Sequence, residues 1–175
     1  MSTAIQKITP FLWFDHEAEE AAHFYTSIFD DAAIGKTTRY GEEGARVSGQ
    51  PPGSVMTIAF RLAGQEFVAL NGGPHFTFSP AISFVVRCDS QTEVDRYWDQ
   101  LAAGGEERAQ QCGWLQDRYG VSWQIVPAAL DTLLDAAEPQ RASRVMQALL
   151  KMKKLDIEAL ERAWAGGPQI TATHS

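Results

Sequence analysis

The chain has 175 residues, which is enough for one domain or two small fused modules around a real core. Its composition, 45% apolar and 21% charged, is ordinary for a globular protein, and the net charge of −7 argues against a nucleic-acid partner, which requires a concentrated basic surface. With neither a long apolar run nor a signal-peptide core, we expect no membrane partner and a cytoplasmic protein with Cys88 and Cys112 as reduced thiols.

The first module, residues 1–75, is predicted to contain a strand, a helix and three further strands. Residues 5–14 are rich in β-branched and aromatic side chains, and Asp15 is the predicted N-cap of the helix that follows. A strand near residues 34–40 and a loop over 41–53 come next. A hairpin formed by residues 54–62 and 66–71 ends this module.

The same order then starts again in a second module, residues 76–127. Residues 81–88 form an almost continuous apolar strand, and Ser90 begins a helix with the spacing of a capping box. Residues 114–119 and 121–126 are predicted to form a second hairpin. Because the two helices start about 75 residues apart, the pattern predicts an internal duplication of a βαβββ unit.

A helical tail is predicted over residues 128–168, followed by a frayed terminus at 169–175. Pro139 precedes a wide apolar stripe at helical spacing, and Asp156 is the predicted cap of a last helix. Such a helical pair must bury its stripe, either against its own module or against a partner subunit.

Several motifs resemble the vicinal-oxygen-chelate superfamily, which includes glyoxalases and bleomycin-resistance proteins. The narrower resemblance is to its PhnB-like branch, often labelled demethylubiquinone 3-methyltransferase-like, and it runs from about Ile5 through Trp164. The motifs are Thr9-Pro-Phe-Leu-Trp-Phe-Asp15, Ala18-Glu-Glu-Ala21, Phe24-Tyr25, Ala69-Leu-Asn-Gly-Gly-Pro74, Cys112-Gly-Trp-Leu115, Asp117 and Tyr119-Gly-Val-Ser-Trp-Gln-Ile-Val-Pro127.

The resemblance implies an α+β fold in which two βαβββ modules form paired half-barrels, followed by the helical tail, in a homodimer. It also implies a small-molecule ligand held in a half-barrel cavity. Two functions fit: a binding protein for a small hydrophobic or aromatic ligand, and a glyoxalase-like lyase or dioxygenase. Methyl transfer is not expected, because Gly72-Gly73 ends a strand and Gly104-Gly105 ends a helix, and neither opens a helix after a strand.

The superfamily's metal site is predicted to be missing, and no other cofactor is expected. In the metalloenzymes, the first and last strands of each module supply histidine, glutamine or glutamate ligands. The matching stretches here offer Gln124 as a plausible ligand, with Asn71 and Thr9 as weak candidates. One plausible ligand does not hold a metal ion.

The candidate ligand-binding residues are strand aromatics and polar groups close to strand ends. The aromatic residues would be core by default but would line the cavity if they point inward. A surface loop is the alternative for His75, a buried structural thiol for Cys112, and a pair with Arg118 on the solvent face for Asp117. The full set is Phe11, Trp13, Asn71, His75, Cys112, Trp114, Asp117, Trp123 and Gln124.

Overall fold

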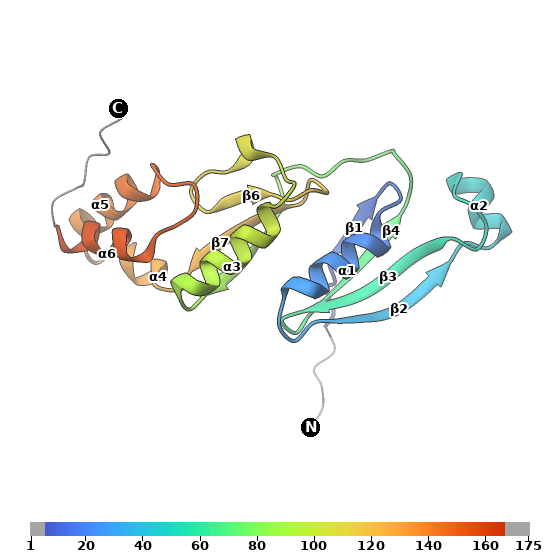
Figure 1. Cartoon of the computed structure of the whole chain (residues 1–175), viewed down its shortest axis with the longest axis horizontal. Coiled ribbons are helices and arrows are strands. Elements are labelled where there is room, and N and C mark those ends of the chain that lie inside the picture. The colour runs from blue at the N-terminus through green and yellow to red at the C-terminus, as the bar shows by residue number, and fades with distance from the viewer. Residues whose placement is uncertain (1–5, 167–175) are drawn as a thin grey trace, which may run out of the picture. The chain divides into compact units, whose positions relative to one another are not determined.

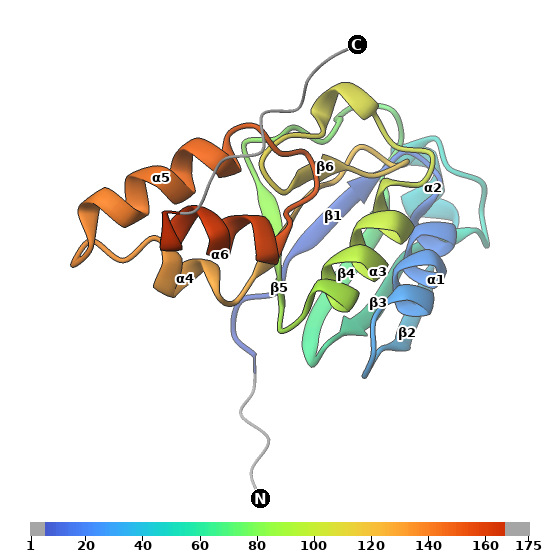
Figure 2. The same ribbon diagram turned by 60° about the vertical axis from the view of Figure 1, so that its left-hand side comes forward.

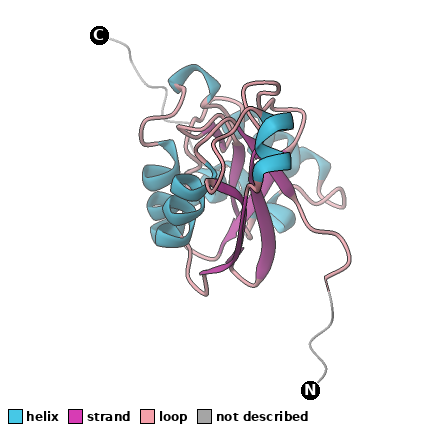
Figure 3. Ribbon diagram, turned by 90° about the vertical axis from the view of Figure 1, so that its right-hand side faces the viewer, coloured by secondary structure: helices cyan, strands magenta, loops and turns pink. Residues whose placement is uncertain are grey.

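The structure of the protein is a computed structural model that describes residues 6–166, so the predicted frayed terminus at 169–175 lies outside the described residues. The chain divides into two compact units, Met1–Phe78 and Ser79–Ser175. Both units combine helices with a small sheet, as Figure 1 and Figure 3 show, and this confirms the predicted α+β class. In the described residues, none of the helices is long and apolar enough to cross a membrane.

The first unit has the predicted order of a strand, a helix and three strands, with one additional short helix. Its sheet has the strand order β1-β4-β3-β2, in which β1 runs parallel to β4 and the other neighbours are antiparallel. Helix α1 packs on one face of this sheet, against β3 and β4 (Figure 2). The elements are β1 (Phe11–Phe14), α1 (Ala18–Ile28), β2 (Ala33–Arg39), α2 (Glu42–Ser48), β3 (Val55–Leu62) and β4 (Gln65–Asn71).

The core of the first unit lies between α1 and the sheet. Small residues on α1 allow a close approach, since Ala18, Ala21 and Ala22 are fully buried. Stacked rings fill the space beside them: the ring centroids of Phe60 and Phe67 are 5.3 Å apart, in cross-strand positions on β3 and β4. This packing commits one face of the sheet to the core and leaves the opposite face for other contacts.

Two local predictions in this unit are wrong. Asp15 is not the N-cap of α1, because the helix begins later, at Ala18, behind Glu17, which makes no side-chain capping bond. The segment 41–53, predicted as a loop, contains α2, which begins after Gly41 and ends at Gly49 in the left-handed conformation. A seven-residue helix that buries only one side chain leaves little periodicity in the sequence.

The second unit repeats the strand–helix start but then differs from the prediction. Among the described residues its sheet has three strands, in the order β5-β7-β6, with β5 parallel to β7. Where the first unit has β2, the second has the short helix η1, because residues 103–111 are polar and lack β-branched and aromatic side chains. The elements are β5 (Ser83–Cys88), α3 (Gln91–Ala102), η1 (Glu107–Ala109), β6 (Trp114–Gln116), β7 (Ser122–Pro127), α4 (Leu130–Leu133), α5 (Pro139–Leu149) and α6 (Ile157–Ala165).

The helix caps predicted for this unit are confirmed. Ser90 caps α3 by accepting a hydrogen bond from the Glu93 N–H at 3.3 Å, and Asp156 caps α6 in the same way from the Ala159 N–H at 2.8 Å. Pro139 occupies the first turn of α5, where its missing N–H costs nothing.

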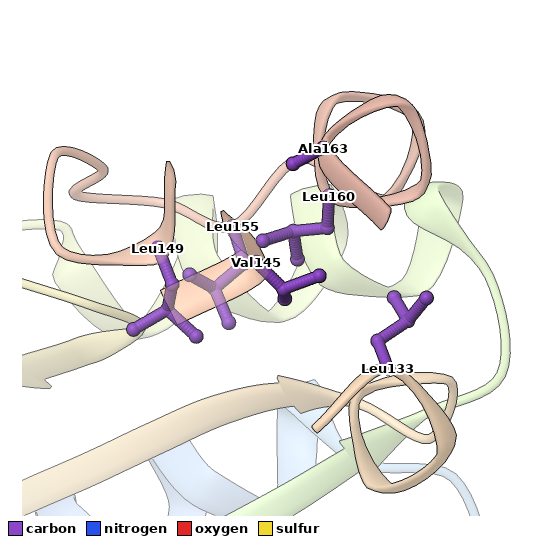
Figure 4. Close-up of a cluster of buried hydrophobic side chains, with 6 residues drawn as sticks. All are labelled: Leu133, Val145, Leu149, Leu155, Leu160 and Ala163. Carbon is purple, nitrogen blue, oxygen red and sulfur yellow. The ribbon is translucent and has the colours of Figure 1, made fainter. Parts of the chain in front are cut away.

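The tail buries part of its apolar stripe within its own unit, while Met146 and Leu150 stay exposed, at 41% and 57%. A partner subunit that covers the exposed part stays a prediction. Figure 4 shows the buried cluster that α4, α5, α6 and the loop between α5 and α6 build together: Leu133, Val145, Leu149, Leu155, Leu160 and Ala163. Main-chain hydrogen bonds of 2.8 Å join the N–H groups of Cys112 and Gly113 to the carbonyls of Met152 and Lys153.

Candidate ligand-binding face

The strongest candidate site is the face of the four-stranded sheet that lies opposite α1, which we call the open face. Alternation along β1 buries Leu12 and Phe14 in the core and places Phe11 and Trp13 on the open face, with Phe11 57% exposed. Strand pairing sets Val68 of β4 beside Phe11, and Leu70 of β4 beside Trp13. The residues are therefore apolar where the two parallel strands meet.

Two cross-strand rows define this face. The first row runs from Trp13 through Leu70 and Thr57 to Thr38, and the second from Phe11 through Val68 to Ala59, with Gly35 beside it. Side chains in the second row become smaller from β1 to β2. At its far end a Cβ on Gly35 would lie only 3.2 Å from the Ala59 carbonyl oxygen. The open face thus has an aromatic wall on β1 and small side chains on β3 and β2.

Trp13 is held in one position by the turn after β4. Its indole Nε1–H donates to the Gly73 carbonyl at 2.9 Å. A Cβ on Gly72 would lie 2.2 Å from the indole ring, so glycine is required for the ring to occupy this place. The ring of Phe76 packs edge-on against the indole at a centroid distance of 5.0 Å. Because Phe76 itself is 66% exposed, aromatic surface continues beyond the strand.

A pair of threonine hydroxyl groups forms the polar part of the open face. The Oγ1 atoms of Thr38 and Thr57 are 2.5 Å apart, and Thr38 Oγ1 also accepts a hydrogen bond from the Thr57 N–H at 3.2 Å. Both side chains are partly buried. At the other end of β3, Arg61 is paired with Asp31 at 3.1 Å.

Asn71, a predicted ligand contact, lies in the core and is satisfied by the backbone. Its side-chain oxygen accepts the Ala18 N–H at 2.8 Å, and its side-chain nitrogen donates to the Val55 carbonyl at 3.1 Å. The residue is 6% exposed. Asn71 therefore binds the first N–H of α1, although it is 53 residues away in the sequence. We had predicted this capping role for Asp15.

The open face of the second sheet carries other predicted residues. Gln124 and Trp114 are cross-strand partners on this face, and Gln124 Nε2 donates to Ser83 Oγ at 2.9 Å. Trp123 alternates to the opposite side, where it is 2% exposed and contacts Phe84 with ring centroids 5.4 Å apart. Trp114 and Gln124 thus lie on an exposed sheet face, while Trp123 belongs to the core.

Asp117 is buried, contrary to the alternative that placed it on the solvent face, and it organises the β6–β7 connection. It is 2% exposed. One carboxylate oxygen accepts the N–H groups of Tyr119 and Val121 at 2.9 and 3.0 Å, and the other accepts the Trp123 indole N–H at 2.8 Å. These bonds give the carboxylate a structural role in the turn.

The last two candidates are not on the strands of either open face. His75 is exposed in the segment that follows β4, beside Gly73. Cys112 is half-buried against the tail cluster, with a φ of 53°, and its N–H is bonded to Met152. Burial raises the pKa of the other thiol, Cys88, to about 11, with further contributions from Glu93 and Asp89.

The residues on the superfamily's metal-bearing strands do not fit a metal ion. Phe11, Val68 and Leu70 supply no donor atoms on the open face of β1 and β4, and Asn71 faces the core. In the part of the chain that the structure describes, no three His, Cys, Asp or Glu side chains cluster at metal-binding distance. The Gln124 amide is the single donor of that kind on β7, and its nitrogen is bonded to Ser83.

Sequence reasoning identified the aromatic residues but missed the other members of the open face. Thr38, Thr57, Val68 and Leu70 become neighbours of Trp13 and Phe11 only through the strand register. The one available signal was the alternation of apolar and polar residues in the predicted β3, which is a pattern of many half-buried strands.

A protein-family model described as 3-demethylubiquinone-9 3-methyltransferase matches residues 6–126. The match ends before the tail, whereas the motifs led us to expect resemblance through Trp164. A search of curated proteins found no significant match.

One solved structure supports the same family. A PhnB protein from Bacillus cereus is 41% identical, with a TM-score of 0.60, and the alignment covers 70% of this chain and 100% of that one. Protein PA1353 from Pseudomonas aeruginosa is 20% identical, with a TM-score of 0.54 over 70% of this chain and 98% of that one, which supports the fold alone. A fosfomycin resistance protein from Listeria monocytogenes, at 17% identity over 75% of this chain and 98% of that one, has a TM-score of 0.45, too low to support an inference.

Proposed function

The chain belongs to the 3-demethylubiquinone-9 3-methyltransferase family, the PhnB-like branch of the glyoxalase/bleomycin-resistance superfamily, and from this premise we propose that it is a small-molecule-binding protein. Its ligand is a small hydrophobic or aromatic molecule, bound on the open face of the first sheet without the superfamily's usual metal. The observation that carries this proposal is the aromatic wall of Phe11 and Trp13, in which the indole is locked by Gly72 and Gly73.

The physical argument rests on preorganisation and apolar area. A tryptophan whose N–H is already bonded presents only its ring to a ligand, and a fixed ring loses little conformational entropy on binding. Aromatic contacts of this kind contribute about 0.5–1.5 kcal/mol each beyond the area they bury. Phe11 and Phe76, both more than half exposed, enlarge the surface available for such contacts.

The methyltransferase named in the family description does not suit this architecture. A doubly wound parallel sheet normally holds S-adenosylmethionine at a glycine-rich turn between a strand and a helix. Here Gly72-Gly73 follows β4 and leads into an irregular segment, and the space a Cβ would need at Gly72 is filled by the Trp13 ring. We therefore assign these glycines to the positioning of Trp13.

An enzyme of the lyase or dioxygenase type is the alternative, and one observation favours it. Gln124, on β7, lies on an open sheet face beside Trp114, and its side-chain oxygen is an acceptable metal ligand. Elemental analysis of protein purified without chelators or a metal-affinity tag separates the two functions. Less than a tenth of a metal ion per chain supports the binding protein, and about one per chain, lost in Gln124→Ala, supports the metalloenzyme.

The binding function is tested with N-phenyl-1-naphthylamine, an uncharged probe whose fluorescence rises in apolar surroundings. We expect saturable binding that Phe11→Ala weakens about fivefold to tenfold, because one aromatic contact is lost. Val47→Ala is the matched control, since Val47 is an apolar residue of the same unit that is 90% exposed on α2. Equal affinities of wild type and Phe11→Ala would rule out this face as the binding site.

The homodimer that the resemblance implies stays a prediction. Sedimentation equilibrium tests it directly, because a dimer has twice the 19.3 kDa mass of the chain.

A further inference from the structure

The Thr38–Thr57 hydroxyl pair has a hydrogen-bonding capacity that the fold does not use. Resting on the proposed binding at the open face, we propose that the ligand is a flat ring system that carries a hydrogen-bond-accepting oxygen, and that this pair donates to that oxygen. The proposal narrows the ligand class from aromatic molecules in general to aryl ketones and related oxygen-bearing rings.

The two hydroxyl groups of the pair have one more proton than their mutual hydrogen bond uses. Each threonine hydroxyl has one proton to donate and two lone pairs. At 2.5 Å the two Oγ1 atoms share one hydrogen bond, which uses one of the two protons. If Thr57 donates to Thr38, the Thr38 proton is left over, and in the reverse arrangement the Thr57 proton is left over. Neither hydroxyl has another acceptor among residues 6–166.

The unused proton lies on the same face as the aromatic wall. Thr57 is the cross-strand partner of Leu70, which in turn is the partner of Trp13, so the hydroxyl pair and the indole lie in one row. Neighbouring strands are about 4.8 Å apart, which places Thr57 roughly 10 Å across the sheet from Trp13. A fused two-ring molecule with one oxygen substituent spans that distance, with its rings against the wall and its oxygen at the pair.

The surroundings of the pair select an oxygen acceptor for the ligand. Both threonines are partly buried, and Leu70 lies next to Thr57, so a bound ligand would exclude water from the unused O–H. A polar group buried without a partner costs free energy, so an apolar molecule without an acceptor would bind with that penalty. A ligand with an accepting oxygen removes it.

Two probes of nearly the same shape test the inference, 2-acetylnaphthalene and 2-ethylnaphthalene, with dissociation constants measured by isothermal titration calorimetry on the full chain. We expect the ketone to bind about fivefold more tightly relative to the hydrocarbon, the ratio that a hydrogen bond of about 1 kcal/mol gives. The double variant Thr38→Val/Thr57→Val should lose this preference and bind the hydrocarbon more tightly than the wild type, because no unpartnered hydroxyl is then buried.

The controls follow from the same proton count. Either single valine variant should keep most of the preference, because the remaining hydroxyl still has a proton to donate. Thr37→Val, the neighbouring exposed threonine of β2 and the partner of Ile58, should behave as wild type. Equal affinities of the two probes for the wild type would overturn the inference and leave the proposed binding function intact. If neither probe binds, the proposed function itself is wrong, and the inference falls with it.

Discussion

The fixed position of Trp13 makes a quantitative prediction about Gly72. Gly72 does not have a positive φ, so an alanine there meets no backbone strain. Its Cβ would, however, lie 2.2 Å from one ring atom of Trp13 and 2.3 Å from the next. The ring must move, because the backbone at Gly72 points the methyl group directly at it. That movement also breaks the 2.9 Å hydrogen bond from the indole to Gly73.

The magnitude is the sum of three effects. Forcing a methyl group into a packed site costs about 1–3 kcal/mol. Losing a hydrogen bond costs about 1 kcal/mol. Replacing glycine by alanine lowers the entropy of the unfolded chain, which returns about 0.4–1 kcal/mol. We therefore expect Gly72→Ala to lower the free energy of unfolding by about 2 kcal/mol.

The assay is guanidinium unfolding of four proteins: wild type, Gly72→Ala, Trp13→Ala and the double variant. If the indole is the reason for the glycine, Gly72→Ala should cost about 2 kcal/mol in the wild type and close to nothing in the Trp13→Ala background. A loss of equal size in both backgrounds would refute the reasoning, because the cost would then come from the backbone at Gly72. Gly72→Ala should also weaken binding of N-phenyl-1-naphthylamine, since it displaces the proposed wall.

Further predictions concern buried polar groups, the tail and titration. Asn71→Ala should lower the free energy of unfolding by about 2–3 kcal/mol, measured by urea denaturation, because two buried backbone groups lose their partner. Leu155→Ala, which truncates a side chain that is 1% exposed, should cost about 2–5 kcal/mol by the same measurement. A hydrogen bond from Lys154 lowers the pKa of Asp95, so this pair stabilises the fold above about pH 4, and its contribution is lost as the pH falls further. Because both side chains are partly exposed, we expect that contribution to be less than about 1 kcal/mol. In Lys154→Met the free energy of unfolding should therefore fall less steeply as the pH drops below about 4. Cys88, whose pKa is raised to about 11 by burial, should resist iodoacetamide at pH 8 until the protein is unfolded, as mass spectrometry would show.

The sequence predicted the elements whose signals are local. Strand alternation, the Ser90 and Asp156 caps and the tail helices each depend on residues within a few positions of one another, and all of them appear in the structure. Helix α2 was missed because a short exposed helix leaves almost no apolar stripe. The strand that the second unit lacks was predicted only from the internal duplication. Residues 103–111 do not form it because they are polar and lack β-branched and aromatic side chains.

The site depended on information that is not local. Asn71 was predicted to contact a ligand, but its side chain bonds the Ala18 N–H and the Val55 carbonyl, and these partners are fixed only by the packing of α1 on the sheet and by strand pairing. Likewise, Phe11 and Trp13 were recognised as aromatic strand residues, while their orientation required the pairing of β1 with β4. A slip of one residue in that register would have exchanged the open face for the core.

The contacts between the tail and the rest of the second unit bear on how easily such a tail can be added to a module or replaced. Residues 152 and 153 are held largely by main-chain groups of 112 and 113, and the main chain has the same donors and acceptors whatever the side chains are. The module contributes a small set of side-chain contacts to the tail: the Gln91 amide bonds the Leu155 carbonyl and the Ile157 N–H, and the missing Cβ of Gly113 makes room for Leu155. Exposed ion pairs add to them, from Asp95 and Asp99 to Lys154 and from Arg87 to Asp131. A helical extension of this kind can thus be gained or replaced with few changes in its host, which agrees with a family match that ends at residue 126.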